Sequence, residues 1–548
     1  MAIPITPLDG RTSRHGVNDD FFPHRLTKSQ VSKAINMIMS KDGVLETRGG
    51  SIKKSDSVTG ASDDVDTIHE FTQRNSDGTL TRNLIIKAGT VVYKFNSATA
   101  VFDSVQTGLS ANKASMVDFI DSSGSEVMVY ADGENFATYN GTTWTSINSN
   151  FTAGAGTDIP RYLWVNNSVL WAAGDDSNPD KLFFSPVLAP NTNWGSSDYI
   201  TLEGGFDKIT GLNEIYNYTS VSTLESIYIV TGRIASEFAL VRVSSEVGST
   251  SHWSLVNDGV NLYWMHRKRF YIGRLRAAEA DGMVVEYISG NMENTLADMT
   301  DGWWNEAQGV WHEDEGQIYW TIKSSGATNA DRCIVYSTDR SQPDVGIPPF
   351  GADTRFVWAG YLEGLDFNSI ARLQDADGVE VILVGTATGL VLEMFSGFKD
   401  SRAVGAVTGT DVSYEVRSRE ETLSPGVGRT MRVKKLLPTM YQKHNGAWNL
   451  QYIVNRSQLL PSTAKTIKFT GRIPYWHDGS DPKISSKWNN TVWTAKPTLT
   501  ATINVGKQAN SILFIFKMSG SNVKQEGSWV SYDLHVQRLP TTRRKAAA

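Results

Sequence analysis

The chain has 548 residues, of which 40% are hydrophobic and 20% are charged, a globular composition rather than a disordered one. This length predicts about three domains, although all-β folds run long. Lys and Arg number 52 and Asp and Glu 58, so the formal net charge of −6 argues against a surface that grips phosphates over its whole extent. Every apolar run is shorter than the ~20 residues that a membrane span needs.

The N-terminal residues MAIPITPLDGRTSRHG lack the apolar segment of a secretory signal peptide, and Cys333 is the only cysteine. Both features predict folding in a reducing cytoplasm without an intrachain disulfide. The 16 Trp, 19 Tyr and 47 Gly favour pleated, half-buried surfaces joined by tight turns. Composition alone therefore indicates a β-rich fold.

Residues 1–24 have no periodicity and are interpreted as an arm. A helix pattern follows, because Thr27 or Ser29 can cap it and one apolar stripe has the spacing i, i+3, i+4, i+7. The stripe consists of Val31, Ala34, Ile35 and Ile38. We predict an arm and a helix over residues 1–43, with the helix either packed on its own domain or docked on a neighbouring subunit through Val31, Ile35 and Ile38. Deletion of residues 1–41 is expected to impair assembly more than folding.

The clearest β pattern lies at residues 204–243, where apolar runs at 215–221, 226–230 and 238–243 alternate with turns. The unit of strand, tight turn, strand and longer loop returns from residue 44 to about residue 400. Further examples are residues 83–95, 126–147, 162–184, 259–272, 316–336 and 379–395. Unit starts lie roughly 35 to 60 residues apart, near the blade length of propellers. We predict an irregular β-propeller of five to seven degenerate blades at residues 44–400, with stacked β-sandwiches as the alternative.

The pattern changes after residue 400, where longer strands are predicted at 432–437, 448–454 and 511–518. Residues 401–540 are therefore assigned to a separate β-sandwich-like domain. Residues 541–548 are polar, small and basic, and are interpreted as a flexible tail. The predicted fold class is all-β throughout, apart from the N-terminal helix.

The nine histidines include no pair at the i, i+2 or i, i+4 spacing that lets two imidazoles reach one metal ion. The acidic stretches HEDEG at residues 312–316 and DADG at 375–378 are interpreted as turns rather than cation sites. A G-x-S-x-G elbow and a P-loop are absent from the sequence. We therefore predict no catalytic, cofactor-binding or metal-binding residues, and a protein that is not an enzyme.

The densest basic and aromatic stretch runs from Trp264 to Tyr271 and contains Arg267, Lys268 and Arg269, with Arg274 shortly after it. Basic residues interleaved with aromatic ones can hold a nucleic-acid backbone by charge and stacking. If the stretch is one strand, alternation places Arg267 and Arg269 on one face and Lys268 on the other. The four basic residues are candidates for a DNA-channel surface or for a subunit interface.

Residues 27–50 carry Asn36, a Gly turn and then Arg48-Gly49; residues 207–232 carry D-x-I-x-G-L before two strands. Residues 259–289 lead into Ser289-Gly290-Asn291 and then the aromatic strand within 303–322. Together these stretches resemble the propeller-bearing tail nozzle and head-tail stabilisation proteins of short-tailed bacteriophages. In that family the first stretch often reads Arg-Pro-Gly, and Gly49 stands where the Pro would be.

The resemblance covers about the first 400 residues. It implies a structural virion protein, assembled in the bacterial host cytoplasm, that forms a ring, expected to be a homohexamer, near the end of a short tail. It also implies a channel for double-stranded DNA, gating of genome exit during ejection, and contacts with a tail adaptor and with fibre or plug proteins. No catalytic residue or cofactor is implied, and a net charge of −6 suits a conduit through which DNA slides.

Two other function classes remain open. The 16 Trp residues motivate a receptor- or carbohydrate-binding propeller, since their rings can stack on sugars. A propeller glycoside hydrolase is the third class, and the NGTTW stretch at residues 140–144 resembles the second half of a sialidase Asp-box without its preceding Ser-x-Asp. Closed cyclic symmetry with a large heterologous interface separates the first class from the other two.

Overall fold

The computed structural model describes most of the chain, and the tail predicted at residues 541–548 lies outside the part described. The described residues are 5–20, 22–41, 43–55, 63–75, 77–121, 123–151, 159–190, 194–195, 197–202, 207–275, 282–341, 355–375, 378–397, 399–401, 403, 409–423, 431–442, 447–455, 461–468, 498–500, 502–518 and 527–538.

Nearly all of the regular structure is β-strand, which confirms the predicted all-β class. Within the described residues, α1 (Glu293–Ala297) is the one α-helix. Single 3-10 turns accompany it: η1 (Asn148–Asn150), η2 (Ala235–Glu237), η3 (His252–Ser254), η4 (Gly290–Met292) and η5 (Trp303–Asn305). No helix in this part of the chain is long and apolar enough to cross a membrane.

Seven antiparallel four-stranded units follow one another in the first 400 residues, six of them as separate sheets. The first three units are β6 (Val65–Arg74), β7 (Leu80–Ala88), β8 (Val91–Asn96) and β9 (Val101–Gln106); β10 (Ser115–Ile120), β11 (Glu126–Ala131), β12 (Phe136–Tyr139) and β13 (Trp144–Ser146); and β14 (Tyr162–Asn166), β15 (Val169–Ala173), β16 (Lys181–Phe184) and β17 (Tyr199–Thr201). The fourth and fifth are β18 (Gly211–Ile215), β19 (Tyr218–Ser222), β20 (Ile227–Thr231) and β21 (Ala239–Ser244); and β22 (Val256–Asn257), β23 (Leu262–His266), β24 (Arg269–Leu275) and β25 (Met283–Tyr287).

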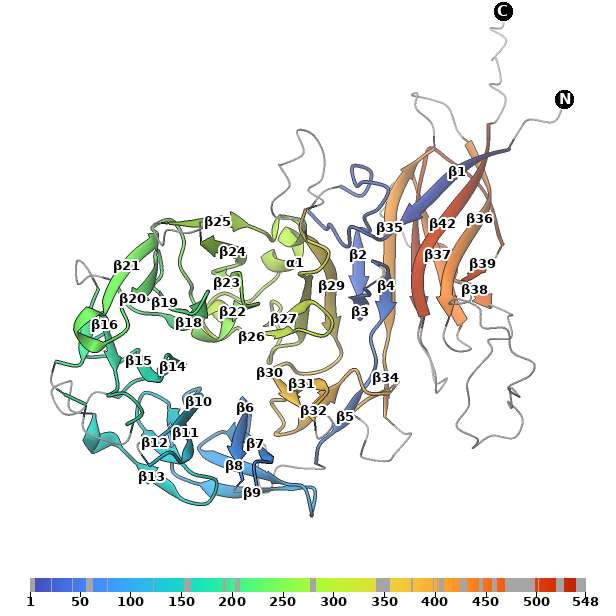
Figure 1. Ribbon diagram of the computed structural model, residues 1–548. Coiled ribbons are helices and arrows are strands. Elements are labelled where there is room, and N and C mark those ends of the chain that lie inside the picture. Colours follow the sequence, from blue (N-terminus) through green and yellow to red (C-terminus); the bar gives the residue numbers. More distant parts are fainter. Residues whose placement is uncertain are drawn as a thin grey trace, which may run out of the picture.

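The sixth unit belongs to a nine-stranded sheet, and the seventh takes its last strand from the N-terminal region. They are β26 (Gly309–His312), β27 (Gln317–Ile322), β28 (Arg332–Ser337) and β29 (Val357–Glu363); and β30 (Ser369–Gln374), β31 (Glu380–Gly385), β32 (Val391–Met394) and β5 (Ser51–Lys53). Figure 1 shows the units side by side around a common centre, and the first strand of each unit contacts the first strand of the next, with β30 in contact with β6. The arrangement is propeller-like.

Apolar clusters fill the gaps between neighbouring units. Between the second and third units, for example, the ring of Phe151 lies 5.7 Å from Phe136 on β12 and 4.8 Å from Phe183 on β16. Strands covered on both faces are buried along their whole length, as β15 and β27 are. This double coverage explains why the sequence shows short continuous apolar runs rather than strict alternation.

One predicted strand is interrupted. The run at residues 215–221 is two strands, β18 and β19, joined by a two-residue turn in which Tyr216 and Asn217 have φ of 48° and 65°. Two consecutive residues with positive φ make the hairpin turn that matches strand twist, and Asn tolerates that conformation. The apolar run at residues 215–221 is therefore part of a hairpin and not a single strand.

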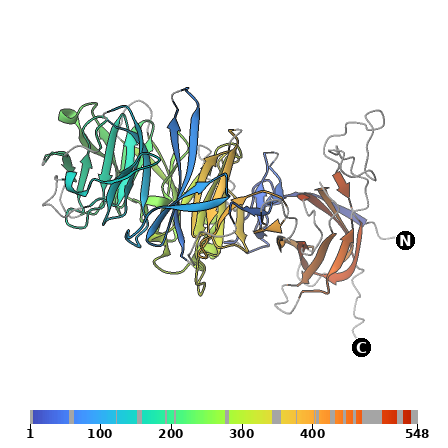
Figure 2. The ribbon, with the colours of Figure 1, turned by 90° about the horizontal axis from the view of Figure 1, so that it is seen from below.

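The C-terminal part contains long strands in two facing sheets (Figure 1). One contains β35 (Tyr414–Thr422), β41 (Ser511–Met518), β37 (Ala447–Val454) and β38 (Lys465–Lys468); the other contains β36 (Met431–Gln442), β42 (Gly527–Arg538), β40 (Ile503–Ala509), β39 (Thr498–Thr500), β1 (Ile5–Thr12), β3 (Met37–Met39) and β4 (Leu45–Thr47). Phe514 on β41 packs across the gap on Tyr532 of β42, with ring centroids 5.7 Å apart. Figure 2 shows this sandwich-like part beside the propeller-like part.

The N-terminal region joins the two parts. β2 (Lys33–Ile35) lies in the nine-stranded sheet, parallel to β29 of the sixth unit and antiparallel to β35 of the sandwich-like part. β1 pairs with β42 along its length, and the β3–β4 hairpin extends the same sheet. Described residues of the predicted arm are thus built into sheets that need distant partners.

The helix predicted across residues 27–42 is wrong, because β2 and β3 occupy that region. Asn36, with φ of 57°, separates the two strands and breaks any helical continuity. Val31 and Ile35 are buried, and Ile38 packs on the same core, so none of the three forms an exposed docking stripe. Strand pairing with β29 and β35 outweighs the local helical pattern, since propensity is a weak preference that tertiary context overrides.

Candidate functional site

The basic stretch singled out in the sequence is the tip of a hairpin. His266 ends β23 and pairs with Arg269 at the start of β24, which leaves Arg267 and Lys268 as the turn. Arg267 has φ of 53°, a conformation that a continuous strand does not contain. The prediction that strand alternation separates Arg267 and Arg269 from Lys268 is therefore wrong, because the turn brings all three together.

The hairpin tip borders a pocket of about 410 Å³. Its lining combines basic and aromatic side chains: Val247, His266, Arg267, Lys268, Arg269, Tyr271 and Trp304. Trp304 comes from η5, which the sequence analysis did not associate with the basic stretch. A pocket of this composition suits an anionic group next to a planar or apolar one.

The charges at the pocket are unevenly compensated. Lys268 Nζ lies 2.8 Å from Asp301 Oδ1, whereas Arg267 and Arg269 are exposed and have no carboxylate within ion-pair distance among the described residues. Arg269 lies over the ring of Tyr287 at 5.4 Å, and a hydrogen bond with Tyr271 raises its pKa. Burial lowers the pKa of His266, whose Nδ1 is 3.1 Å from the Gly248 carbonyl oxygen. Two cations without an ion-pair partner among the described residues thus stand beside a histidine whose pKa is lowered.

Arg274 does not belong to this pocket. It lies farther along β24, where its Nη2 is 2.9 Å from Glu286 Oε2, and Arg355 approaches the other oxygen of Glu286 at 3.2 Å. Arg276, which follows it in the sequence, lies outside the described residues. The structure therefore unites three of the four predicted basic residues and assigns the fourth to an internal ion pair.

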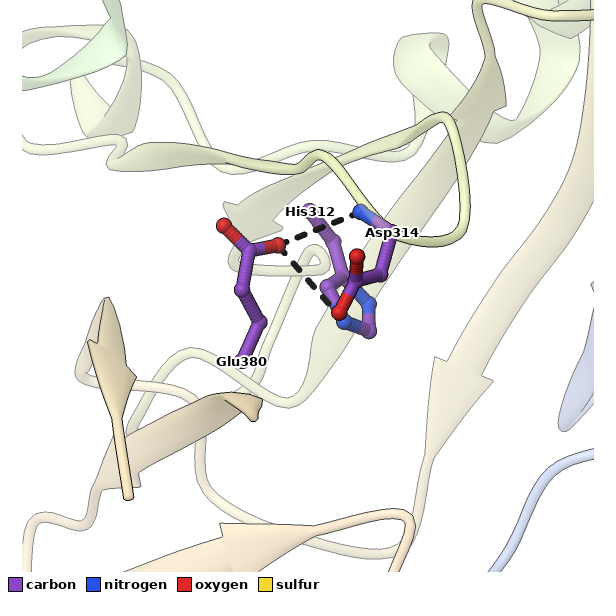
Figure 3. Close-up of side chains that lie close together, drawn as sticks. All are labelled: His312, Asp314 and Glu380. Carbon is purple, nitrogen blue, oxygen red and sulfur yellow. Dashed lines mark hydrogen bonds and ion pairs between the residues drawn. The ribbon is translucent and has the colours of Figure 1, made fainter. Parts of the chain in front are cut away.

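A second cluster joins His312, Asp314 and Glu380 (Figure 3). His312 ends β26, Asp314 lies in the turn before β27, and Glu380 begins β31 of the next unit. The turn predicted at residues 312–316 is confirmed, because His312 pairs with Gln317 across it. One ligand atom from each of the three residues lies within 4.8 Å of the others. Glu380 could not be assigned to the cluster from the sequence, because only the packing of two units brings it there.

The ring of His312 stacks on Phe395, with centroids 6.5 Å apart, but its nitrogens have few polar contacts. Its side chain is 10% exposed, its Nδ1 has no hydrogen-bond partner among the described residues, and its Nε2 is 4.0 Å from Glu380 Oε2. Burial lowers the pKa of His312, although Glu380, Glu315 and Asp314 act in the opposite direction. The Oε1 atom of Glu380 is held by Arg372 at 3.0 Å, and its Oε2 accepts the backbone N–H of Asp314 at 3.2 Å.

The third cluster is the joint between the two parts of the protein. Arg48 is fully buried and donates from Nη1 and Nη2 to the two oxygens of Asp400, at 2.8 and 2.6 Å. Its Nε donates to Asn36 Oδ1 at 2.9 Å, and Asn36 Nδ2 donates to the Ser413 carbonyl at 2.7 Å. The Tyr414 hydroxyl donates to the Arg48 carbonyl at 3.0 Å. These hydrogen bonds tie the connection between β2 and β3, the start of β35 and the segment after β32 to Arg48.

The one cysteine, Cys333, does not have the features of a reactive thiol. It lies fully buried on β28, and burial raises the pKa of its thiol. A thiol held in its protonated form is a poor nucleophile and a poor metal ligand. Cys333 is a core residue.

No family model and no curated protein matches the chain. Among solved structures, it is similar to the extracellular domain of a putative one component system from B. thetaiotaomicron, with 12% identity, a TM-score of 0.34, and coverage of 63% of this chain and 40% of that one. It is also similar to a chain of the Mitotic Checkpoint Complex, with 10% identity, a TM-score of 0.36, and coverage of 62% and 92%. At these TM-scores neither likeness bears on function.

Proposed function

We propose that the protein is a structural subunit of the tail of a short-tailed bacteriophage, where it forms a ring around the DNA channel and controls genome exit. The observation that carries the proposal is the fixed joint between the propeller-like and sandwich-like parts. β2 makes them one nine-stranded sheet, and the buried pair of Arg48 and Asp400 locks that connection. The protein is built as a rigid assembly unit.

Rigidity matters because a head-to-tail interface closes into a ring only when each subunit turns by a fixed angle. If the two parts that carry the interfaces were joined by a flexible hinge, the angle between successive subunits would vary. Open assemblies would then be favoured over closed rings. Domains joined by a simple linker move relative to one another by default. Shared backbone pairing and a buried ion pair remove that freedom here.

The stretches that carry the family resemblance include the residues of this joint. Asn36 and Arg48, from the first stretch, form its hydrogen-bonded centre. Asn291, from the third stretch, accepts a hydrogen bond from Asn18 Nδ2 at 2.7 Å and donates one to the Phe356 carbonyl at 3.0 Å. These residues make buried hydrogen bonds to distant segments of the chain. A family with this architecture would need them, which supports the resemblance.

We also propose that the seven units form a closed seven-bladed propeller. The continuous contacts of first strands, from β6 around to β30 and back to β6, support this count. β5 completes the seventh unit by pairing with β32, although it precedes the first unit in the chain. Closure by a strand from the opposite end of the repeat array leaves no long unpaired edge.

The hairpin pocket is the surface that we assign to contact with DNA or with an acidic neighbouring subunit. Arg267 and Arg269 are exposed cations on a chain whose net charge is −6. A few cations in an otherwise acidic conduit steer the phosphate backbone without holding it tightly. We expect a low affinity for DNA that falls steeply with salt.

Electron microscopy of the purified full-length protein tests the proposal directly, because a ring with a central channel is visible at low resolution. We expect rings, alone or after addition of the neighbouring tail proteins, and sedimentation of a species several times the chain mass. A chain that remains monomeric in both conditions would contradict the proposal. Glycan binding by such a monomer would instead favour the carbohydrate-binding class.

The structure weakens the motive for that alternative. Among the tryptophans whose burial the structure describes, six are buried, and the other six are half-buried rather than exposed. The buried ones are Trp171, Trp194, Trp264, Trp320, Trp358 and Trp448. Tryptophans in the core are not available to stack on sugars.

A further inference from the structure

We propose that His312, Asp314 and Glu380 form a site for a divalent transition-metal ion of the zinc class, which braces the sixth and seventh units against each other. This metal site is independent of the proposed role in a phage tail. The ligands are His312 Nε2, the Asp314 carboxylate and Glu380 Oε2, whose ligand atoms lie within 4.8 Å of one another. Figure 3 shows the three side chains converging from two neighbouring units.

The donor set matches the chemistry of the ion. Zinc is bound by imidazole nitrogen and carboxylate oxygen at ~2.0–2.2 Å, and three protein ligands with a water molecule are a common arrangement. Tetrahedral ligand atoms then lie about 3.3 Å apart. The cluster has to contract modestly to reach that spacing. Asp314 can move to do so, because it is exposed in the turn between β26 and β27.

The imidazole of His312 is buried and lacks a hydrogen bond to any described residue. Its side chain is 10% exposed, its Nδ1 is buried without a partner, and its Nε2 lies 4.0 Å from Glu380 Oε2, too far for a hydrogen bond. An unmade hydrogen bond of a buried polar group is costly, so such groups call for an explanation. An ion between His312 and Glu380 would occupy the space that the 4.0 Å separation leaves.

A second histidine, His69, makes a direct hydrogen bond between two other units. His69 on β6 and Asp118 on β10 also connect two neighbouring units, and there Nε2 lies 2.7 Å from Oδ1, a direct hydrogen bond. The pair of His312 and Glu380 is more buried and more than 1 Å longer. One inter-unit contact is complete by itself, whereas the other has room for a bridging atom.

The local charge also favours a cation. Four acidic residues gather at the cluster: Glu313, Asp314, Glu315 and Glu380. Among the described residues the guanidinium of Arg372 pairs with Glu380 Oε1 and approaches Glu313 at 3.6 Å. The four carboxylates outnumber this cation.

The test is thermal unfolding of the full-length protein. Bound metal ions are first removed with a chelator, and the protein is then titrated with Zn²⁺, Mn²⁺, Mg²⁺ or Ca²⁺. We expect Zn²⁺, at about one ion per chain, to raise the midpoint by at least about 2 °C, and Mg²⁺ and Ca²⁺ to have no effect. The absence of a Zn²⁺ shift, or an equal response to Ca²⁺ and Mg²⁺, would overturn the proposal.

The variants D314N, H312Q and E380Q separate this site from adventitious binding. Each should abolish the Zn²⁺ shift, and D314N keeps the test valid if a buried substitution prevents folding. The matched control is H69Q, which removes another inter-unit histidine and should retain the full shift. Co²⁺ provides a second readout, since its visible absorption reports a nitrogen- and oxygen-bound site. A wild-type Co²⁺ spectrum that survives in D314N would also refute the assignment.

Discussion

Arg48 and Asp400 lie 352 residues apart in the sequence and meet in a fully buried, bidentate ion pair at 2.8 and 2.6 Å. The pair joins the start of the chain to the point where the propeller-like part gives way to the sandwich-like part. Both groups are further hydrogen-bonded, Arg48 by Asn36 and Asp400 by the hydroxyl of Ser51. A buried pair satisfied in this way fixes an orientation more than it adds stability.

Removing one partner of this pair should be costly. We expect Arg48→Met to lower the free energy of unfolding by about 3–5 kcal/mol, because Asp400 is left as an uncompensated buried charge. The double variant Arg48→Met with Asp400→Leu should recover most of the loss. The exposed pair of Lys208 and Asp176, 52% and 97% exposed, is the control, and Lys208→Met should change stability by at most about 1 kcal/mol. Denaturant unfolding measures all three variants.

Gly360 and Gly364 provide a matched test of the connection through β2. Both have positive φ, 104° and 94°. An added Cβ at Gly360 would lie 2.2 Å from the Ala34 carbonyl oxygen, whereas the same atom at Gly364 meets nothing within 4 Å. Gly364→Ala should cost only backbone strain, about 1–3 kcal/mol, and Gly360→Ala should cost clearly more because it separates β29 from β2. Equal losses in denaturant unfolding would show that β2 is not held tightly.

Deletion of residues 1–41 should prevent folding of the sandwich-like part, in contrast to the expectation from the sequence that it impairs assembly more than folding. The deletion removes β1, β2 and β3, which pair with β42, β29 and β35, and β4. It also removes the buried side chains of Val17 and Val31. We expect insoluble protein, or limited proteolysis that spares only the propeller-like part. A soluble monomer with an unchanged unfolding midpoint would contradict this.

The hairpin tip should account for binding of polyanions. We expect the double variant Arg267→Ala with Arg269→Ala to weaken binding of double-stranded DNA and to lower the slope of log K against log salt by about 2, since two cations are lost. Arg274→Ala is the matched control, because that residue pairs with Glu286 and does not line the pocket. Fluorescence anisotropy at several salt concentrations measures both. The same loss in the control would mean that general charge, and not the pocket, holds DNA.

Acid should destabilise the protein partly through His252. Burial lowers the pKa of His252 from 6.5 to about 3, and the charges of Arg161 and Lys113 add to the effect. Its Nδ1 accepts the backbone N–H of Leu212 at 3.2 Å, which requires a neutral ring nitrogen there.

Because the folded pKa is below the unfolded one, the unfolded state binds more protons between about pH 6.5 and about pH 3. The stabilising contribution is complete above pH 6.5 and is lost as the pH falls through that window, by up to ~1.4 kcal/mol per unit. His252→Asn keeps an acceptor for Leu212 but cannot titrate, so its stability should depend less on pH than that of the wild type. Denaturant unfolding between pH 4 and pH 7 compares the two, and parallel curves would exclude this role.

Local pattern was enough to predict many of the strands. β7 and β8 lie in the predicted run at 83–95, β31 and β32 in that at 379–395, and β41 coincides with the run at 511–518. Short apolar runs bounded by turn residues depend on neighbours within a few positions, which a sequence displays directly. The cluster of Arg267, Lys268 and Arg269 was found for the same reason.

The predicted N-terminal helix and the missed role of Glu380 both concern residues whose structure depends on partners far away in the sequence. The apolar spacing of Val31, Ile35 and Ile38 satisfies a helix, yet the backbone pairs with residues near 361 and 415–417, and nothing local signals that pairing. Glu380 joins His312 and Asp314 only because two units pack side by side.

The sequence by itself determined many of the strands and the basic charge at residues 267–269, because these follow from side-chain chemistry within a few residues. Only the tertiary structure decided where β2 and β5 pair, that Arg48 meets Asp400, and that Nδ1 of His312 is buried without a hydrogen-bond partner among the described residues. The physical reason is that backbone donors and buried charges must be satisfied by whichever groups the packed chain brings within reach, however far away they lie in the sequence.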